Sequence, residues 1–413
     1  MLGWEAVENV HWEWLFHAYG VAEETPEKLR GLTSEDAALR EAGIDHLEGV
    51  VLHQGTIYAA TAPAVRVVAG ILNEPILREP LDDEAPTLRA GVAESFSGLE
   101  ALLGFLAEAG ESLAWADEVE EVEEPTEKQM KKLAKHLRKD EDGEDDKGWL
   151  SPMVEVMMKR AVLDLRAMAP EVLEAIVPFV LDENPEIAQA AMNAVGKWSA
   201  VQVGSPQAEA AAQVLRTRLE AATHRNEKAN LVLALGEMGQ DVSAWLDDED
   251  EAVRACAALF VRTSQANEIL IGALTHPEQV NSWFASAKPA YFPLHVRFRL
   301  LGEVIERGVT IEQVLPAAVA LISQSSAMAA DAEWGPILRV TFPDAQYVSG
   351  SGVRPPLPEH LTAAQRAVLE ALVANENLWD PTNGNARFAR MEVGLPNTRE
   401  EVTAYIRDTP VEM

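Results

Sequence analysis

Residues 247–263 read Asp-Asp-Glu-Asp-Glu-Ala-Val-Arg-Ala-Cys-Ala-Ala-Leu-Phe-Val-Arg-Thr, an acidic run followed by an apolar stripe. Apolar pairs in the second half recur every three to four residues, at Ala252/Val253, Cys256/Ala257 and Leu259/Phe260. This spacing is typical of one buried face of an α-helix. The acidic run supplies side-chain oxygens that cap a helix and complement the positive end of its dipole. We therefore predict a turn followed by an amphipathic helix.

The same order of helix, polar turn and helix recurs elsewhere in the chain. Apolar helical runs at 172–181 and 207–219 are each followed by a polar turn and a further apolar run. An irregular period of roughly 30–40 residues suits stacked helix pairs, because one pair cannot bury its apolar face alone. No convincing series of strands is present. The sequence predicts an all-α fold, an armadillo-like α-solenoid of helix pairs.

Composition limits the compartment and the partners. The chain has 413 residues with 34 Lys+Arg against 67 Asp+Glu, a formal charge of −33, and Cys256 is its one cysteine. A single cysteine excludes an internal disulfide framework and a Cys-rich zinc module. The negative charge repels phosphate, which argues against a nucleic-acid partner and against anionic membranes. Neither a secretory signal nor a long uncharged apolar stretch is visible, so we expect a cytoplasmic protein without a membrane partner.

Four parts are expected along the chain. A helical block over 1–116 precedes a charged insertion over 117–148, repeats over 149–334, and a Pro/Gly-rich loop with a helical cap over 335–413. The insertion holds 13 acidic and 7 basic residues, with a basic helix predicted over 127–139. It is typical of a solvated linker, and the alternative is a regulatory or partner-binding arm.

Polar and aromatic residues near the N-terminus form the first candidate site. His53, Gln54 and Tyr58 follow a predicted helix, and an antiparallel first helix would bring His17 and Tyr19 close. One interpretation is a binding pocket. The other is a set of buried hydrogen bonds that closes the end of the solenoid. Trp12 belongs to a tryptophan cluster that either anchors a partner or covers the terminal repeat.

The acidic turn of the quoted stretch is the second candidate site, for a basic partner: Asp247, Asp248, Glu249 and Asp250. The alternative is a set of helix caps on a solvated face.

Catalytic and metal-binding patterns are not recognisable. His11 and His17 are six residues apart, which does not place them on one helical face. Cys256 lies in an alanine-rich stripe typical of a buried, inert thiol. Gly350-Ser351-Gly352 lacks the strand-turn-helix context of a nucleophile elbow. We expect no enzyme, no catalytic residue, no metal and no cofactor.

The quoted stretch resembles HEAT repeats, in which an aspartate lies at the turn and Val-Arg opens the second helix. The matching residues are Asp247, Asp248, Val253 and Arg254, with a looser copy at Asp36, Leu39 and Arg40. Both ends of the chain are also similar to a group of bacterial HEAT-repeat proteins, at Trp12, 17–20, 25–26, 53–61, 361–366, Trp379 and 394–400. Some members of that group lie beside toxin genes and are presumed to be immunity proteins.

These observations favour a non-enzymatic protein-binding solenoid. The resemblance implies an immunity-like or antitoxin-like inhibitor that occludes a basic partner such as a toxin or nuclease. The charge of −33 would accelerate capture of such a partner. Two alternatives remain open: a scaffold subunit of a larger assembly, and an enzyme or small-ligand protein that uses the N-terminal His/Tyr pocket.

Overall fold

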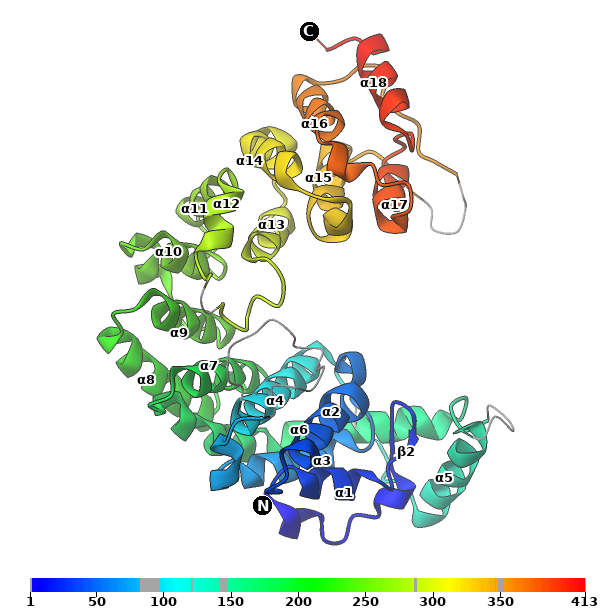
Figure 1. Ribbon diagram of the computed structural model, residues 1–413, viewed down its shortest axis with the longest axis vertical. Coiled ribbons are helices and arrows are strands. Elements are labelled where there is room, and N and C mark those ends of the chain that lie inside the picture. Colours follow the sequence, from blue (N-terminus) through cyan, green and yellow to red (C-terminus); the bar gives the residue numbers. More distant parts are fainter. Residues whose placement is uncertain are drawn as a thin grey trace. The chain divides into compact units, whose positions relative to one another are not determined.

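In the computed structural model, α-helices dominate the residues that the structure describes, which are 2–81, 97–119, 122–141, 147–285, 288–345, 347 and 353–412. The strands in these ranges are the two-residue strands β1 (Phe16–His17) and β2 (Gly20–Val21), which form one antiparallel hairpin. The predicted all-α class is thereby confirmed (Figure 1). None of the helices in these ranges is long and apolar enough to cross a membrane.

The chain divides into two compact units, Met1–Gln240 and Asp241–Met413. The boundary falls inside the block expected over 149–334. Unit 1 contains α1 (Thr25–Gly31), α2 (Ala37–His46), α3 (Thr61–Ile71), α4 (Gly98–Trp115), α5 (Glu127–Glu141), α6 (Pro152–Ile176), α7 (Pro185–Ala200), α8 (Pro206–Ala221) and α9 (Arg225–Glu237). Its core forms where α4 packs on α7, α7 on α9, and α3 on α6.

Unit 2 contains α10 (Glu251–Ala258), α11 (Ser264–Leu274), α12 (Pro277–Ser282), α13 (Val296–Glu306), α14 (Ile311–Gln324), α15 (Gly335–Thr341), α16 (Ala363–Ala374), α17 (Gly384–Glu392) and α18 (Arg399–Asp408). In this unit α10 packs on α11, α11 on α13, α14 on α16, and α16 on α18. Cys256 is buried on α10, and burial raises the pKa of its thiol.

Three turns that precede helices share one hydrogen-bonded design. Their sequences are Ser34-Glu35-Asp36, Asp182-Glu183-Asn184 and Asp248-Glu249-Asp250. In each turn the first side chain accepts from the backbone N–H of the third residue, at 3.1, 3.0 and 2.8 Å. The third side chain then accepts from the backbone N–H two residues further on, at 3.0, 2.9 and 2.9 Å, and so caps the next helix.

An arginine four residues after the cap holds two of these turns. Arg40 donates from Nη1 to the carbonyls of Ser34 and Glu35 at 2.9 and 3.1 Å. Arg254 donates from Nη1 to the carbonyls of Asp248 and Glu249 at 2.7 and 3.0 Å. The equivalent position of the middle turn is Ala188, and arginines from elsewhere reach that turn and the residue Val180 just before it. Arg78 pairs with Asp182 at 2.6 Å, and Arg218 donates to the carbonyl of Val180.

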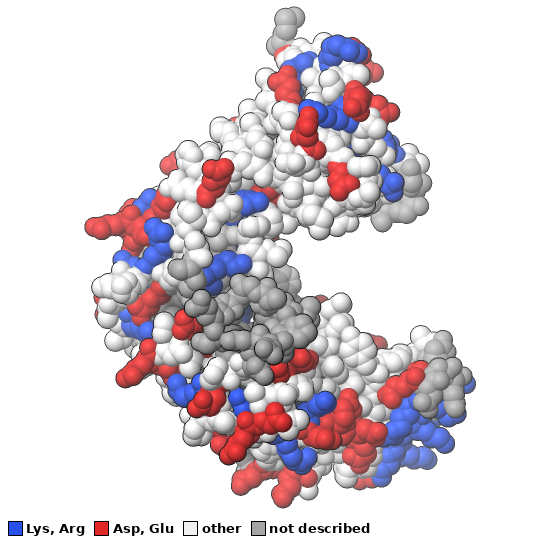
Figure 2. Space-filling model, viewed as in Figure 1, with Lys and Arg blue, Asp and Glu red and all other residues white. Residues whose placement is uncertain are grey.

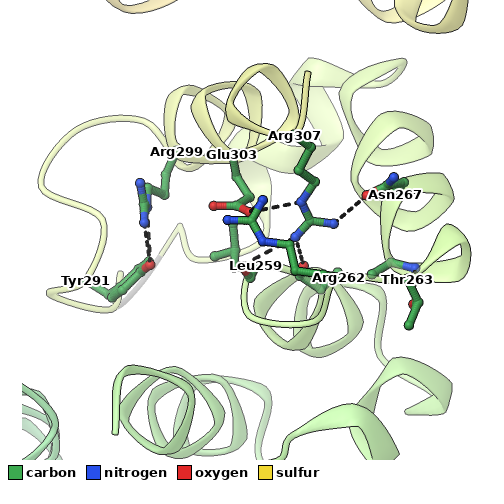
Figure 3. Close-up of polar contacts among 10 residues, drawn as sticks. Leu259, Arg262, Thr263, Asn267, Tyr291, Arg299, Glu303 and Arg307 are labelled. Atoms are coloured by element: carbon green, nitrogen blue, oxygen red, sulfur yellow. Dashed lines mark hydrogen bonds and ion pairs between the residues drawn. The ribbon is translucent and has the colours of Figure 1, made fainter. Parts of the chain in front are cut away.

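Arg307 connects the end of α13 to the end of α10 in unit 2 by hydrogen bonds (Figure 3). Arg307 follows α13 and donates to the carbonyl of Ala258 at 2.5 Å, at the end of α10. It also donates to Asn267 Oδ1 at 2.6 Å and pairs with the buried Glu303 at 2.9 Å. The exposed Arg262 pairs with the same carboxylate at 3.1 Å. These bonds satisfy carbonyls that the end of α10 leaves open.

Several local expectations need correction. The segment 12–21 is a short 3-10 turn and the β1–β2 hairpin, not a helix, and Gly20 adopts a φ of 144° there. Residues 335–341 of the expected loop form α15, while Gly350-Ser351-Gly352 lies outside the described residues. The expected helical cap begins with α16, whose N-cap is Thr362.

The charged segment over 117–148 is not simply a solvated linker, although residues 120–121 and 142–146 lie outside the described ones. Its helix α5 buries Leu133, Ala134 and Leu137 against Phe16 and Val21 of the hairpin. The apolar positions fall on one helical face, and that face is covered by the hairpin. The basic helix predicted over 127–139 is confirmed, with two more residues at its C-terminal end.

Candidate partner-binding groove

The first N-terminal candidates lie in the interior. Trp12 is 7% exposed and His17 is 4% exposed, so a partner cannot reach either side chain in this structure. His17 Nδ1 accepts from the backbone N–H of Tyr19 at 3.3 Å, and Nε2 faces Glu24 Oε1 at 2.7 Å. His17 is therefore the neutral tautomer with its proton on Nε2, donated to the carboxylate.

His17, Glu24 and His46 form a cluster that sequence spacing did not reveal, because His17 lies on β1 and His46 on α2. One ligand-type atom from each residue lies within 4.8 Å of the others. His46 Nε2 lies 2.9 Å from the hydroxyl of Thr25, and burial lowers the pKa of His46 to about 4. In this arrangement His17 Nε2 faces Glu24 and His46 Nε2 faces the hydroxyl of Thr25, so hydrogen bonds hold the three side chains together.

The fold brings two of the remaining N-terminal candidates together, Tyr19 and His53. Tyr19 is 61% exposed, and its hydroxyl lies 3.5 Å from His53 Nδ1, which also contacts the carbonyl of Gly49 at 2.9 Å. Tyr58 is half-buried and packs edge-on against Phe16. Tyr58 therefore packs against the buried Phe16, whereas Tyr19 contacts His53. Gln54 instead lines a different surface, described next.

The backbone at Gln54 is strained. Gln54 has a φ of 52° and a ψ of 34°, the one positive φ among non-glycine residues in the described part of the chain, and Gly55 follows with a φ of 72°. A π-helical turn, Leu47–Val51, immediately precedes this segment. A Cβ added at Gly55 would lie 3.3 Å from the hydroxyl of Ser112 on α4. Such strain persists only where surrounding contacts enforce it, and it concentrates at ligand-binding sites.

A groove of about 990 Å³ opens between this strained segment, the C-terminal end of α4 and the N-terminal end of α6. Trp115 and Leu150 line it and are 83% and 74% exposed. Trp149, Val154 and Met158 supply further apolar lining. Two large apolar side chains at one open groove are typical of an interaction site rather than of isolated surface residues.

The rim of the groove is acidic. It carries Glu108, Glu111, Asp117 and Glu155 against the one ammonium of Lys159. Lys159 pairs with Glu155 at 2.6 Å within α6. Glu111 pairs at 3.0 Å with Lys197, which is half-buried and also paired with Glu237. The groove therefore offers apolar contact next to an excess of carboxylates over ammonium groups.

The acidic turn Asp247–Asp250 belongs to unit 2 and serves as a capping network. Beyond the bonds within the turn described above, Asp247 accepts from Gln265 Nε2 at 2.8 Å. The carbonyl of Glu249 is held by Arg254. These contacts favour the helix-cap interpretation of the turn.

Comparisons with known proteins add little. No family model matches the chain, and no curated protein is significantly similar to it. Among solved structures, the crystal structure of an engineered protein is 14% identical, over 94% of this chain and 98% of that chain, with a TM-score of 0.23. At that TM-score the similarity carries no argument about fold or function.

Proposed function

We propose that this chain is a non-enzymatic, protein-binding α-solenoid, related to HEAT-repeat proteins, that captures a basic partner and inhibits it by occlusion, as an immunity protein does. The observation that carries the proposal is the acid-rimmed groove with Trp115 and Leu150 exposed. The three turns of common design and the succession of packed helix pairs support the solenoid.

The groove suits a partner segment that places an apolar side chain between Lys or Arg residues. Tryptophan is prominent among the side chains that dominate binding energy at interfaces, and Trp115 is the last residue of α4. The carboxylates Glu108, Glu111, Asp117 and Glu155 attract basic segments and orient them. The formal charge of −33 extends this attraction beyond the groove, and salt would screen it.

The experiment uses a short fluorescent peptide of Lys and Leu with one central Trp. The double variant Trp115→Ser/Leu150→Ser is expected to bind it about tenfold more weakly, since both changes remove apolar contact area. The matched control is Leu181→Ser/Val203→Ser, which changes two exposed apolar residues of unit 1 outside the groove. Equal binding by the groove variant and the wild-type protein would rule out the groove as the site.

Inhibition is tested separately from binding. A basic protein captured by the wild-type chain and lost by the groove variant is assayed for its own activity with saturating wild-type chain. Occlusion predicts loss of activity. A tight complex in which the partner stays fully active would favour a scaffold subunit instead.

A further inference from the structure

Helix α5 presents a lysine stripe on an otherwise acidic protein. Lys128, Lys132 and Lys135 are exposed and follow the i, i+4, i+7 spacing that places them on one face of the helix. Leu133 and Leu137 are buried against the hairpin. In Figure 2, blue side chains gather where Figure 1 places α5, whereas red side chains dominate the neighbouring surface.

The three lysines of the stripe have no ion-pair partner among the residues that the structure describes. By contrast, Lys131 pairs with Glu127 at 3.0 Å and Arg138 pairs with Glu23 at 2.8 Å. Three adjacent ammonium groups repel one another along the helix. An opposite charge from outside the chain would relieve that repulsion.

Helix α5 is held firmly beside the groove. Glu141 accepts from the backbone N–H of Val21 at 2.6 Å, and Asp140 accepts from the backbone N–H of Trp149 at 2.9 Å. Trp149, Val154 and Met158 line the groove and also pack in the cluster that holds α5. The same three side chains therefore line the groove and pack in the cluster that contains α5.

We propose that the partner seated in the groove also presents an acidic segment, which lies along the lysine stripe of α5. This inference rests on the proposed function and names the charge pattern of the partner: a basic segment with an apolar anchor, next to an acidic one. Adjacent surfaces of opposite sign fix the orientation of a partner and reject uniformly basic proteins.

Other anionic occupants fit less well. The apolar face of α5 is already buried, so the helix cannot insert into a lipid surface. The net charge of −33 repels a long polyanion such as a nucleic acid, whereas a short acidic segment beside a basic one is drawn in by the groove.

The test compares two peptide probes with the same Lys/Leu/Trp half. One probe continues into a Glu-rich tail and the other into a Gly-Ser tail of equal length. The wild-type chain is expected to bind the Glu-tailed probe about fivefold more tightly, since each exposed charge pair adds a modest amount. The variant Lys128→Glu/Lys132→Glu/Lys135→Glu is expected to reverse that preference, and the matched Lys→Arg triple variant to keep it.

The sign of the charge-reversal effect decides between the alternatives. If the partner site is uniformly acidic, the Lys→Glu variant binds both probes more tightly, which overturns the inference and leaves the groove proposal standing. Tighter binding of anionic vesicles or of single-stranded DNA than of the Glu-tailed probe would also overturn it. If the groove double variant loses binding and the lysine variant does not, this inference fails while the proposed function stands. If the groove double variant still binds, the proposed function fails.

Discussion

The turn before α2 in unit 1 and the turn before α10 in unit 2 have the same internal hydrogen bonds but different surroundings. Arg40 is 3% exposed and also donates from Nη2 to the carbonyl of Pro80 at 3.1 Å. Arg254 is half-buried and lines an open pocket of about 230 Å³. A local motif therefore fixes the bonds within a turn, while the packing around the turn sets what those bonds contribute to stability.

The largest expected effect is the difference between the two arginines. Arg40→Ala should lower the free energy of unfolding by about 3 kcal/mol, because three carbonyls lose a charged donor in a buried setting. Arg254→Ala should lower it by about 1 kcal/mol, since water can replace the lost donor. Urea denaturation followed by circular dichroism measures both. Equal losses would show that burial does not distinguish the two turns.

The second effect is a loss of stability at low pH, expected at α2 in unit 1 and not at α10 in unit 2. His46, on the helix that follows the Arg40 turn, has a pKa lowered to about 4 from 6.5, chiefly by burial. The unfolded chain therefore takes up the proton first, and stability falls as pH drops from about 6.5 to about 4. Between pH 7 and pH 5 the expected loss is about 2 kcal/mol.

Hydrogen exchange measured peptide by peptide checks this pH effect. After correction for intrinsic exchange rates, α2 should lose protection at pH 5 while α10 keeps its protection. His46→Gln removes the titrating group and serves as the control. A pH-independent difference between α2 and α10 would contradict the assignment to His46.

The third effect should be the same in all three turns. Asp36→Ala, Asn184→Ala and Asp250→Ala each remove a side chain that caps the following helix. Each should destabilise the protein by about 1 kcal/mol, and Ser should restore most of the loss. A much larger loss at Asp36 alone would mean that burial increases the contribution of the cap to stability, as it does for the arginine.

The smallest effect concerns the middle turn, which lacks its own arginine. Arg78→Ala removes an ion pair with Asp182 in which the Arg78 side chain is 49% exposed. We expect a loss of about 0.5 kcal/mol that disappears in high salt, as for other exposed pairs. A loss as large as that of Arg40→Ala would show that a distant arginine can fully replace the local one.

The candidate site was harder to predict from the sequence than the helices were. Gln54 was singled out and does line the groove, but Trp12 and His17 are buried in the hydrogen-bonded interior. Trp115 and Leu150 carry no motif, and the sequence does not show that a helix end and a turn 35 residues apart share one groove. The exposure of a large apolar side chain is a tertiary property.

What the sequence determined by itself is local: the helical class, the acidic charge, and an acidic turn that caps a helix in the stretch 247–263. A cap acts over two or three residues, so its geometry can be inferred from neighbours in the chain. Tertiary structure alone decided which surfaces are covered: α5 docks on the hairpin, Arg218 reaches Val180 across 38 residues, and the groove stays open. Burial depends on contacts between distant segments, and no local pattern specifies which of those contacts form.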